Sequence, residues 1–435
     1  QWINRGQDNI IIYWIDTNSG KKTELYNEKQ KEWVEWFEDL YFLENGSGFL
    51  LRSNVDGWDH LYYYDLKGKL IRRLTQGDWQ VNSFTVDESN KKVYFSTPLK
   101  KSTDRYFCVV GLDGKGFKQL TTVPGTHTGS ASPNSKYYLD SYSSITTPAR
   151  TELYRMNGKL VRVISESKNT QYDDYDLAKV EMFTIPSGDG YDLPAVWALP
   201  ADFDPNKKYA VIFNEYGGPN SGSVRNSFPM GLSQSYLAQQ GIISISVDHR
   251  GSGHFGKKGV ALMHRNLGKW EMNDYAAAVK WLKTKSFIDS TKIGITGGSY
   301  GGYVAALALT QGADYFTHGI AEYGVMDWKL YDNVYTERYM DTPAENPDGY
   351  KAGSVMSYID KYKGKMLITH GTMDDNVHMQ NTIQLITQMQ KQNKDFELML
   401  YPNFRHGVGM PHATRERVQF WFKYLLGREL DTAKD

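Results

Sequence analysis

The sequence predicts a chain of two parts: repeated all-β modules over residues 1–177, then a mostly parallel, doubly wound α/β sheet over residues 178–435. Three observations predict this division. Short β-rich hairpins recur at a regular spacing in the first part. Apolar strands alternate with helical stretches in the second part. A serine bracketed by glycines stands between such a strand and such a helix.

The first part repeats a hairpin with a glycine at its turn. Asp or Asn precedes each turn glycine at close range, and β-branched and aromatic runs flank it. The spacings between successive turn glycines are 48, 46 and 44 residues, for Gly20, Gly68, Gly114 and Gly158. A period in the forties with several short strands per unit is typical of a β-propeller blade. About four blades are present and they begin in mid-pattern, so we expect the C-terminal part of a larger β-propeller, with further residues upstream of Gln1.

The second part opens with a predicted antiparallel hairpin, formed by runs at 180–185 and 193–199. Near-continuous apolar runs follow at 209–214 and 242–247, as expected for strands buried on both faces. Further strands are predicted at 292–296, near 317–322 and at 365–370. Helical periodicity predicts helices over about 270–285, 380–392 and 413–426. In the first of these, Tyr275, Ala278, Val279 and Leu282 share one face. A short strand at 397–401 completes the predicted sheet.

Ser299 lies at the centre of Gly297-Gly298-Ser299-Tyr300-Gly301-Gly302, between a strand and a helix-forming run. This order predicts a nucleophile elbow, in which the turn is too tight for side chains two residues before and two after the serine. The helix N-terminus then lies close to where negative charge develops in acyl transfer. An elbow in the middle of a parallel sheet predicts the α/β-hydrolase fold.

Partners for this serine are expected downstream, with the acid before the histidine. The strand ending at His370 leads into Asp374 and Asp375, and either can orient the base, because functional side chains gather at the carboxyl ends of parallel strands. His406 follows the last strand, where the base is expected. Three other histidines lie in or near the same loops and compete with it: His370, His378 and His412.

Composition excludes several function classes. The chain has 50 basic and 50 acidic residues, so its zero net charge does not indicate a nucleic-acid partner. No apolar run approaches the roughly 18 residues of a membrane span. The single cysteine, Cys108, excludes an internal disulfide. We expect no cofactor and no metal site.

Five motifs together resemble the dipeptidyl peptidase IV branch of the prolyl oligopeptidase family, a group of serine peptidases, in a bacterial-type member whose N-terminal part is missing. They are the elbow through Tyr303, the stretch Tyr331-Asp332-Asn333-Val334-Tyr335-Thr336-Glu337-Arg338-Tyr339-Met340, the stretch 370–378, Glu215-Tyr216-Gly217-Gly218-Pro219 and Asp248-His249-Arg250-Gly251-Ser252-Gly253. The resemblance covers about residue 178 to the end, and the first part matches in architecture alone.

The resemblance implies a role for each matched residue. Ser299 is the expected nucleophile, Asp374 the acid and His406 the base. Tyr216 and the backbone N–H of Tyr300 are the expected oxyanion donors. Asn376 is expected to hydrogen-bond a substrate carbonyl, and an apolar site for proline is expected from Val325, Trp328, Tyr331, Tyr335 and Val377. The spacing of the three aromatic residues in that set predicts one helical face. The segment 248–251 is expected to be a structural loop near the site.

The implied activity is removal of N-terminal X-Pro or X-Ala dipeptides from peptides. Two departures leave alternatives open. Gly298 stands where the family usually has tryptophan, and the acidic pair that anchors the substrate's amino group lies upstream in relatives. Prolyl tripeptidyl or acylaminoacyl peptidase activity, a non-catalytic binding homologue and an esterase are the alternatives. The resemblance further implies a periplasmic or extracellular location and a homodimer.

Overall fold

The computed structural model describes residues 1–167, 172, 174–229 and 232–430. The chain forms two compact units. The first contains Gln1–Asp173, Arg225–Met230 and His254–Ala261, and the second contains Asp174–Val224, Gly231–Gly253 and Leu262–Asp435. Two short segments after residue 178 belong to the first unit, so the units are not consecutive along the chain. The predicted domain boundary between residues 177 and 178 stays a prediction.

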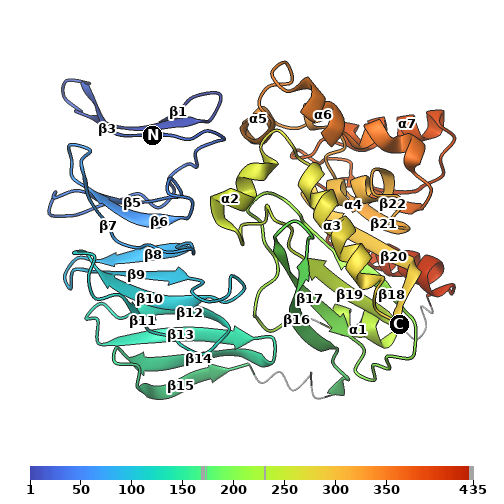
Figure 1. The fold of residues 1–435 in the computed structure, drawn as a ribbon, viewed down its shortest axis with the longest axis horizontal. Coiled ribbons are helices and arrows are strands. Elements are labelled where there is room, and N and C mark those ends of the chain that lie inside the picture. The colour runs from blue at the N-terminus through green and yellow to red at the C-terminus, as the bar shows by residue number, and fades with distance from the viewer. Residues whose placement is uncertain (168–171, 173, 230–231, 431–435) are drawn as a thin grey trace. The chain divides into compact units, whose positions relative to one another are not determined.

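The first unit contains four antiparallel sheets that follow one another along the chain, in the blue to teal part of Figure 1. The first sheet has three strands: β1 (Trp2–Ile3), β2 (Asn9–Ile15) and β3 (Lys22–Lys29). The next two sheets have four strands each: β4 (Tyr41–Phe42), β5 (Phe49–Ser53), β6 (His60–Tyr64) and β7 (Leu70–Arg73), then β8 (Ser83–Asp87), β9 (Lys92–Thr97), β10 (Tyr106–Gly111) and β11 (Lys118–Gln119). The fourth contains β12 (Thr126–Ala131), β13 (Tyr137–Ser144), β14 (Thr147–Arg155) and β15 (Leu160–Glu166). This confirms the predicted C-terminal part of a β-propeller.

Apolar side chains between neighbouring sheets form the core of this unit. Ile10, Ile12 and Leu25 of the first sheet pack with Phe49 and Leu51 of the second. Each such side chain contributes about 1.5–3 kcal/mol when fully buried. The four turn glycines have φ between 67° and 90°, which confirms the predicted hairpin turns, because this region favours glycine.

Two segments from the C-terminal half of the chain complete the first unit. The side chain of Asn226 donates to Asp104 Oδ1 at 2.8 Å, and its carbonyl accepts from Thr126 Oγ1 at 2.9 Å. Lys257, in helix α2 (Gly256–Val260), donates to the carbonyl of Trp33 at 2.8 Å and lies 4.0 Å from that indole ring. These contacts join the two segments to the rest of the first unit by hydrogen bonds.

The second unit is built on an eight-stranded sheet of order β16-β17-β19-β18-β20-β21-β22-β23. Strands β16 (Lys179–Pro186) and β17 (Asp192–Leu199) form the predicted antiparallel hairpin, and β17 pairs antiparallel with β19 (Ile242–Val247). All later pairings are parallel, through β18 (Tyr209–Asn214), β20 (Ile288–Gly298), β21 (His318–Glu322), β22 (Lys365–Gly371) and β23 (Glu397–Tyr401).

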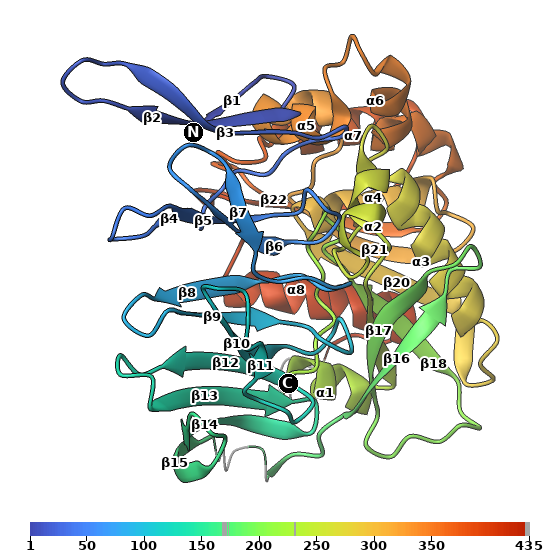
Figure 2. The same ribbon diagram turned by 60° about the vertical axis from the view of Figure 1, so that its left-hand side comes forward.

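Helices cover both faces of this sheet (Figures 1 and 2). Ile212 packs with Trp421 and Leu425, whereas the next residue, Phe213, contacts the ring of Tyr275 on the opposite face. Strand alternation therefore divides β18 between two helical layers, which confirms the doubly wound α/β-hydrolase fold. The helices of this unit are α1 (Ser233–Gln239), α3 (Lys269–Leu282), α4 (Tyr300–Thr310), α5 (Asn333–Met340), α6 (Pro347–Gly353), α7 (Gln380–Lys391) and α8 (Pro411–Trp421). In the parts of the chain described, no helix combines the length and apolarity that crossing a bilayer requires.

Candidate active site

Ser299 stands alone between the end of β20 and the first residue of α4. Its φ of 59° and ψ of −119° are strained for a residue with a side chain. A Cβ on Gly297 would lie 2.1 Å from the carbonyl oxygen of Glu215, and a Cβ on Gly301 would lie 2.2 Å from the same oxygen. Glycine is therefore required on both sides, which confirms the predicted strand, sharp turn and helix.

Asp374 lies just after β22 and is buried. Its Oδ1 accepts hydrogen bonds from the backbone N–H groups of Asn376 and Val377, both at 3.0 Å. Its Oδ2 lies 2.8 Å from Nδ1 of His406. Asp375, the alternative acid, is exposed and pairs with Arg405 at 3.0 Å. The geometry therefore favours Asp374 as the acid that orients the histidine.

His406 follows β23 and donates its Nδ1–H to Asp374, so Nε2 is left as the acceptor nitrogen. This is the tautomer that a general base needs. Nε2 of His370 also lies 3.2 Å from Oδ2 of Asp374, but His370 is fully buried. Its Nδ1 lies 2.8 Å from Oγ1 of Thr382, and its Nε2 lies 2.8 Å from the carbonyl oxygen of Val377. Burial lowers the pKa of His370, so the neutral imidazole contacts Asp374 and can help to hold it in place.

Among the described residues, the other two competing histidines make no hydrogen bond or ion pair with Asp374. His378 is exposed. His412 lies 3.4 Å from the hydroxyl of Tyr401 and 3.6 Å from Glu416. Among the described residues, no hydrogen bond joins Ser299 to His406. Catalytic hydrogen bonds often tighten once substrate is bound, so the geometry is consistent with a nucleophile and base that meet in the complex.

The expected oxyanion donors are Tyr216 and the backbone N–H of Tyr300. Tyr216 follows β18, and its ring lies 5.9 Å from that of Tyr300. Partial loss of hydration raises the pKa of Tyr216, although 42% of the residue is exposed, so its hydroxyl keeps its proton and can donate. Tyr300 is the first residue of α4, where a backbone N–H has no partner within the helix. The two groups supply an O–H and an N–H beside the elbow.

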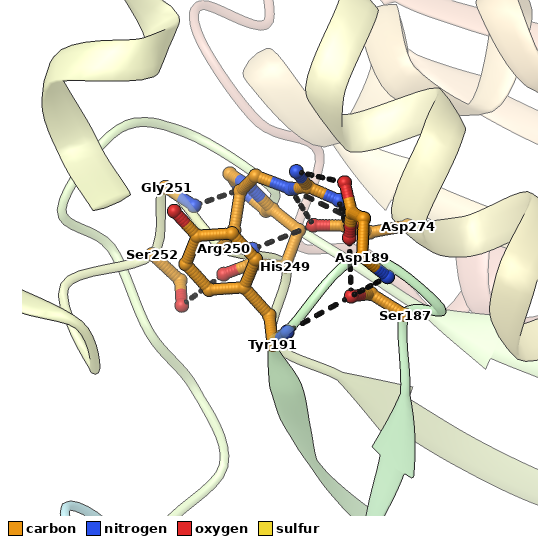
Figure 3. Close-up of polar contacts among 8 residues, drawn as sticks. All are labelled: Ser187, Asp189, Tyr191, His249, Arg250, Gly251, Ser252 and Asp274. Atoms are coloured by element: carbon orange, nitrogen blue, oxygen red, sulfur yellow. Dashed lines mark hydrogen bonds and ion pairs between the residues drawn. The ribbon is translucent and has the colours of Figure 1, made fainter. Parts of the chain in front are cut away.

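The loop after β19 shapes the backbone that carries Tyr216. Nε2 of His249 lies 3.0 Å from the carbonyl oxygen of Gly217, and its Nδ1 accepts the N–H of Gly251 at 3.1 Å. Figure 3 shows how Arg250 fixes this loop, with its guanidinium group on Asp274 of α3 at 2.6 Å and on Asp189 at 2.7 Å. The expectation of a structural loop agrees with these contacts.

The aromatic residues predicted to share one helical face do not lie on one helix, so that prediction was wrong. Trp328 begins the 3-10 helix Trp328–Leu330, Tyr331 is extended, and Tyr335 lies in α5. The chain bends at Asp332, whose side chain caps α5. The rings still gather, with centroids 6.2 Å apart for Trp328 and Tyr335 and 5.5 Å apart for Tyr331 and Tyr335.

Tyr300 joins this aromatic cluster through Trp328, at 5.3 Å between centroids. Asn376 accepts a hydrogen bond from the hydroxyl of Tyr331 at 2.8 Å. Val325 and Val377 are buried. The roles of these residues toward substrate stay predictions.

Sequence reasoning missed two residues at the elbow. Glu271 is fully buried, and its Oε1 accepts from the hydroxyl of Tyr300 at 2.5 Å. It stands four residues before Tyr275, so the helical period that placed Tyr275 on the buried face would have placed Glu271 there too. Tyr323 is the second, with its ring 4.8 Å from the imidazole of His406. No sequence pattern indicates it. In the described residues, no group of three or more His, Cys, Asp or Glu could hold a metal ion.

Two family models match the chain. The prolyl oligopeptidase family matches residues 228–428, and the dipeptidyl peptidase IV N-terminal region matches residues 1–149. The chain is 34% identical over 444 residues to the probable dipeptidyl-aminopeptidase B of Neosartorya fischeri, covering 96% of this chain and 48% of that protein. It is 33% identical over 449 residues to dipeptidyl-aminopeptidase B of Aspergillus niger, covering 96% and 49%. It thus spans about half the length of these relatives.

A solved structure agrees with these matches. The crystal structure of Porphyromonas gingivalis dipeptidyl peptidase 4 superposes with a TM-score of 0.91 at 31% identity, covering 98% of this chain and 61% of that one. The likeness therefore extends over both compact units and includes the elbow with its surroundings. The chain belongs to the dipeptidyl peptidase IV branch of the prolyl oligopeptidase family.

Proposed function

We propose that this protein is a serine exopeptidase that releases N-terminal X-Pro or X-Ala dipeptides from peptides through an acyl-enzyme. The observation that carries the proposal is the 2.8 Å contact between His406 Nδ1 and Asp374 Oδ2, at the same sheet edge as the strained Ser299. The relatives' names, dipeptidyl-aminopeptidase B and dipeptidyl peptidase 4, support the dipeptide product.

In the proposed first half-reaction, Ser299 Oγ attacks the scissile carbonyl carbon while His406 Nε2 takes the hydroxyl proton. The carbonyl oxygen gains negative charge, which the hydroxyl of Tyr216 and the N–H of Tyr300 stabilise by donating to it. The C–N bond then breaks as His406 returns the proton to the leaving amine. A dipeptidyl ester of Ser299 remains.

In the second half-reaction, water attacks the ester carbonyl and gives its proton to His406. The C–Oγ bond breaks, and His406 protonates Ser299 as the dipeptide acid leaves. Asp374 stays ionised throughout and stabilises the imidazolium that forms in each half-reaction. Its two backbone N–H donors hold it in place for this role.

Specificity is assigned to the aromatic cluster of Tyr300, Trp328, Tyr331 and Tyr335 beside the elbow. A proline ring is rigid and apolar, so aromatic walls bind it well, and a short alanine side chain also fits such walls. Tyr331 further holds Asn376, which we assign to a substrate carbonyl. Homodimerisation stays a prediction.

Initial rates on chromogenic amides of Gly-Pro, acetyl-Gly-Pro and Ala-Ala-Pro test the proposal. We expect cleavage of the free Gly-Pro amide only, and a loss of kcat of about 10³-fold or more in Ser299→Ala and in His406→Ala. Preference for Ala-Ala-Pro would make the protein a tripeptidyl peptidase. Equal cleavage of the acetylated amide would replace the exopeptidase proposal with an endopeptidase or acylaminoacyl peptidase. Unchanged cleavage by Ser299→Ala would refute the proposed nucleophile.

A further inference from the structure

Tyr323 has a backbone conformation that is rare for a bulky residue. It comes directly after β21 and has a φ of 38°. A large aromatic side chain at positive φ is a true outlier, and such strain persists only where the surroundings impose it. Its backbone N–H donates to the carbonyl of Thr369 at 2.7 Å. The backbone carbonyl of the preceding residue, Glu322, accepts the N–H of Ser299 at 3.0 Å.

The first turn of α4 imposes this conformation through close backbone contacts. A Cβ on Gly302 would lie 2.2 Å from the carbonyl oxygen of Glu322. A Cβ on Gly324 would lie 2.5 Å from the carbonyl carbon of Gly302. The segment 322–324 therefore lies directly against the elbow helix, with Tyr323 at its centre.

The side chain of Tyr323 extends between the residue before the nucleophile and the base. A Cβ on Gly298 would lie 2.3 Å from its hydroxyl oxygen and 2.6 Å from its Cζ. Its ring centroid lies 4.8 Å from that of His406, with the two rings inclined at 72°. The phenol ring thus occupies the space that a side chain at position 298 would need.

One hydrogen bond does not fix an imidazole completely. The Nδ1 contact with Asp374 holds one edge of the His406 ring, but the ring can still tilt about that bond, which swings Nε2 away from the serine. A perpendicular aromatic neighbour limits this tilt, because edge-to-face contact between two aromatic rings is favourable. Tyr323 is the aromatic neighbour that the structure records at His406 among the described residues.

We propose that Tyr323 is a positioning residue for His406: its ring holds the imidazole plane, and Gly298 is glycine because that ring needs the space. The inference rests on the proposed function, in which His406 is the base. On this inference, the strained backbone of Tyr323 serves to place its ring against the imidazole of His406.

The test compares Tyr323→Ala, Tyr323→Phe, Gly298→Ala and the double variant Gly298→Ala/Tyr323→Ala on the Gly-Pro amide. We expect Tyr323→Ala to lower kcat about 3- to 10-fold with KM within about twofold, because the ring contact acts on the base and not on binding. Tyr323→Phe keeps the ring and should retain most of the wild-type kcat. Gly298→Ala should lower kcat by displacing the ring, and the double variant should be no worse than Tyr323→Ala alone, because the two changes act through one contact.

Three results would overturn the inference: wild-type kcat in Tyr323→Ala, a loss in Tyr323→Phe equal to that in Tyr323→Ala, or full additivity in the double variant. Urea unfolding of each variant separates lost positioning from lost stability. If Tyr323→Ala does not fold, Gly298→Ala and Tyr323→Phe still decide the matter, since the first moves the ring and the second keeps it. Ser299→Ala is measured in parallel, so that failure of the proposed nucleophile is distinguished from failure of this inference.

Discussion

The phenolic hydroxyl of Tyr300 lies 2.5 Å from Oε1 of Glu271, a carboxyl group with no exposure to solvent. The same oxygen accepts the N–H of Gly268 at 2.9 Å, while Oε2 has no hydrogen-bond partner in the described part of the chain. Tyr300 is the residue after Ser299, so a hydrogen bond through Glu271 links α3 to the first residue of the elbow helix. Burial raises the pKa of Glu271 to about 7.

This raised pKa predicts a pH-dependent stability. A carboxyl group that holds its proton more tightly in the folded state than in the unfolded state stabilises the fold fully at low pH. That contribution is lost as the pH rises from the ordinary value of 4.5 to about 7. We therefore expect the free energy of unfolding of the wild type, measured relative to Glu271→Gln, to fall by about 2–3 kcal/mol between pH 5 and pH 8.

Urea unfolding at the two pH values makes this measurement. Glu38→Gln is the matched control, because Glu38 is exposed and the change removes one carboxylate from the surface. The prediction would be contradicted if the difference in the free energy of unfolding between the wild type and Glu271→Gln were the same at both pH values.

The two neighbouring aspartates should differ in their effect on activity. In Asp374→Asn the amide no longer fixes the His406 tautomer, and we expect kcat to fall roughly 10³- to 10⁴-fold. Asp375→Asn breaks only a surface ion pair with Arg405, worth at most about 1 kcal/mol, and should leave kcat close to that of the wild type. Initial rates on the Gly-Pro amide compare them. Equal losses in the two variants would remove Asp374 from its assigned role.

The ion pairs of Arg250 should differ in their contribution to stability. Its guanidinium group is buried between the rings of Tyr191 and Trp270. The Cζ atom lies 4.6 Å from the ring centroid of Tyr191 and 4.4 Å from that of Trp270. Asp274→Asn leaves this buried cation without its fully buried partner, so we expect a loss of about 3–5 kcal/mol in the free energy of unfolding. Asp189 is half exposed, and Asp189→Asn should cost about 1 kcal/mol or less. Urea unfolding measures both, and equal costs would argue against this assignment.

Gly301 should not tolerate a methyl group. Gly301→Ala places a Cβ 2.2 Å from the backbone of Glu215, which cannot yield without moving β18, so we expect a cost of about 3 kcal/mol or abolished folding. Gly409→Ala meets no atom within 4 Å and should change stability by about 0.5 kcal/mol or less. Thermal unfolding compares the two variants. A Gly301→Ala protein as stable as the wild type would show that the turn can relax.

Much of the fold could be predicted because its signals are local. Runs such as 209–214 are apolar throughout, since β18 is covered on both faces, and the repeated turn glycines reflect a φ that other residues avoid. The site was harder where an assignment depends on a distant partner. Position along the chain does not separate Asp374 from Asp375, because their difference arises in the loop that brings His406 to one of them. Before the structure, only the resemblance to the family favoured Asp374.

The misjudged helical face has a similar cause. Residues three and four apart suit a helix, but the extended Tyr331 and the cap at Asp332 break it, and the rings meet through tertiary packing instead. Tyr323 carried no signal at all. Its conformation follows from contacts of Gly302 and Gly324 that exist only after the sheet and α4 have assembled.

The membership of Arg225–Met230 and His254–Ala261 in the first compact unit affects how the chain can be divided. No single cut in the sequence yields both units intact, because any piece ending near residue 173 lacks Asn226 and Lys257, and the complementary piece carries them without their partners. Gene fusions or swaps that treat the two units as consecutive modules would therefore leave Asp104 and the Trp33 carbonyl without these donors. A swap that keeps these hydrogen bonds must therefore carry both units together.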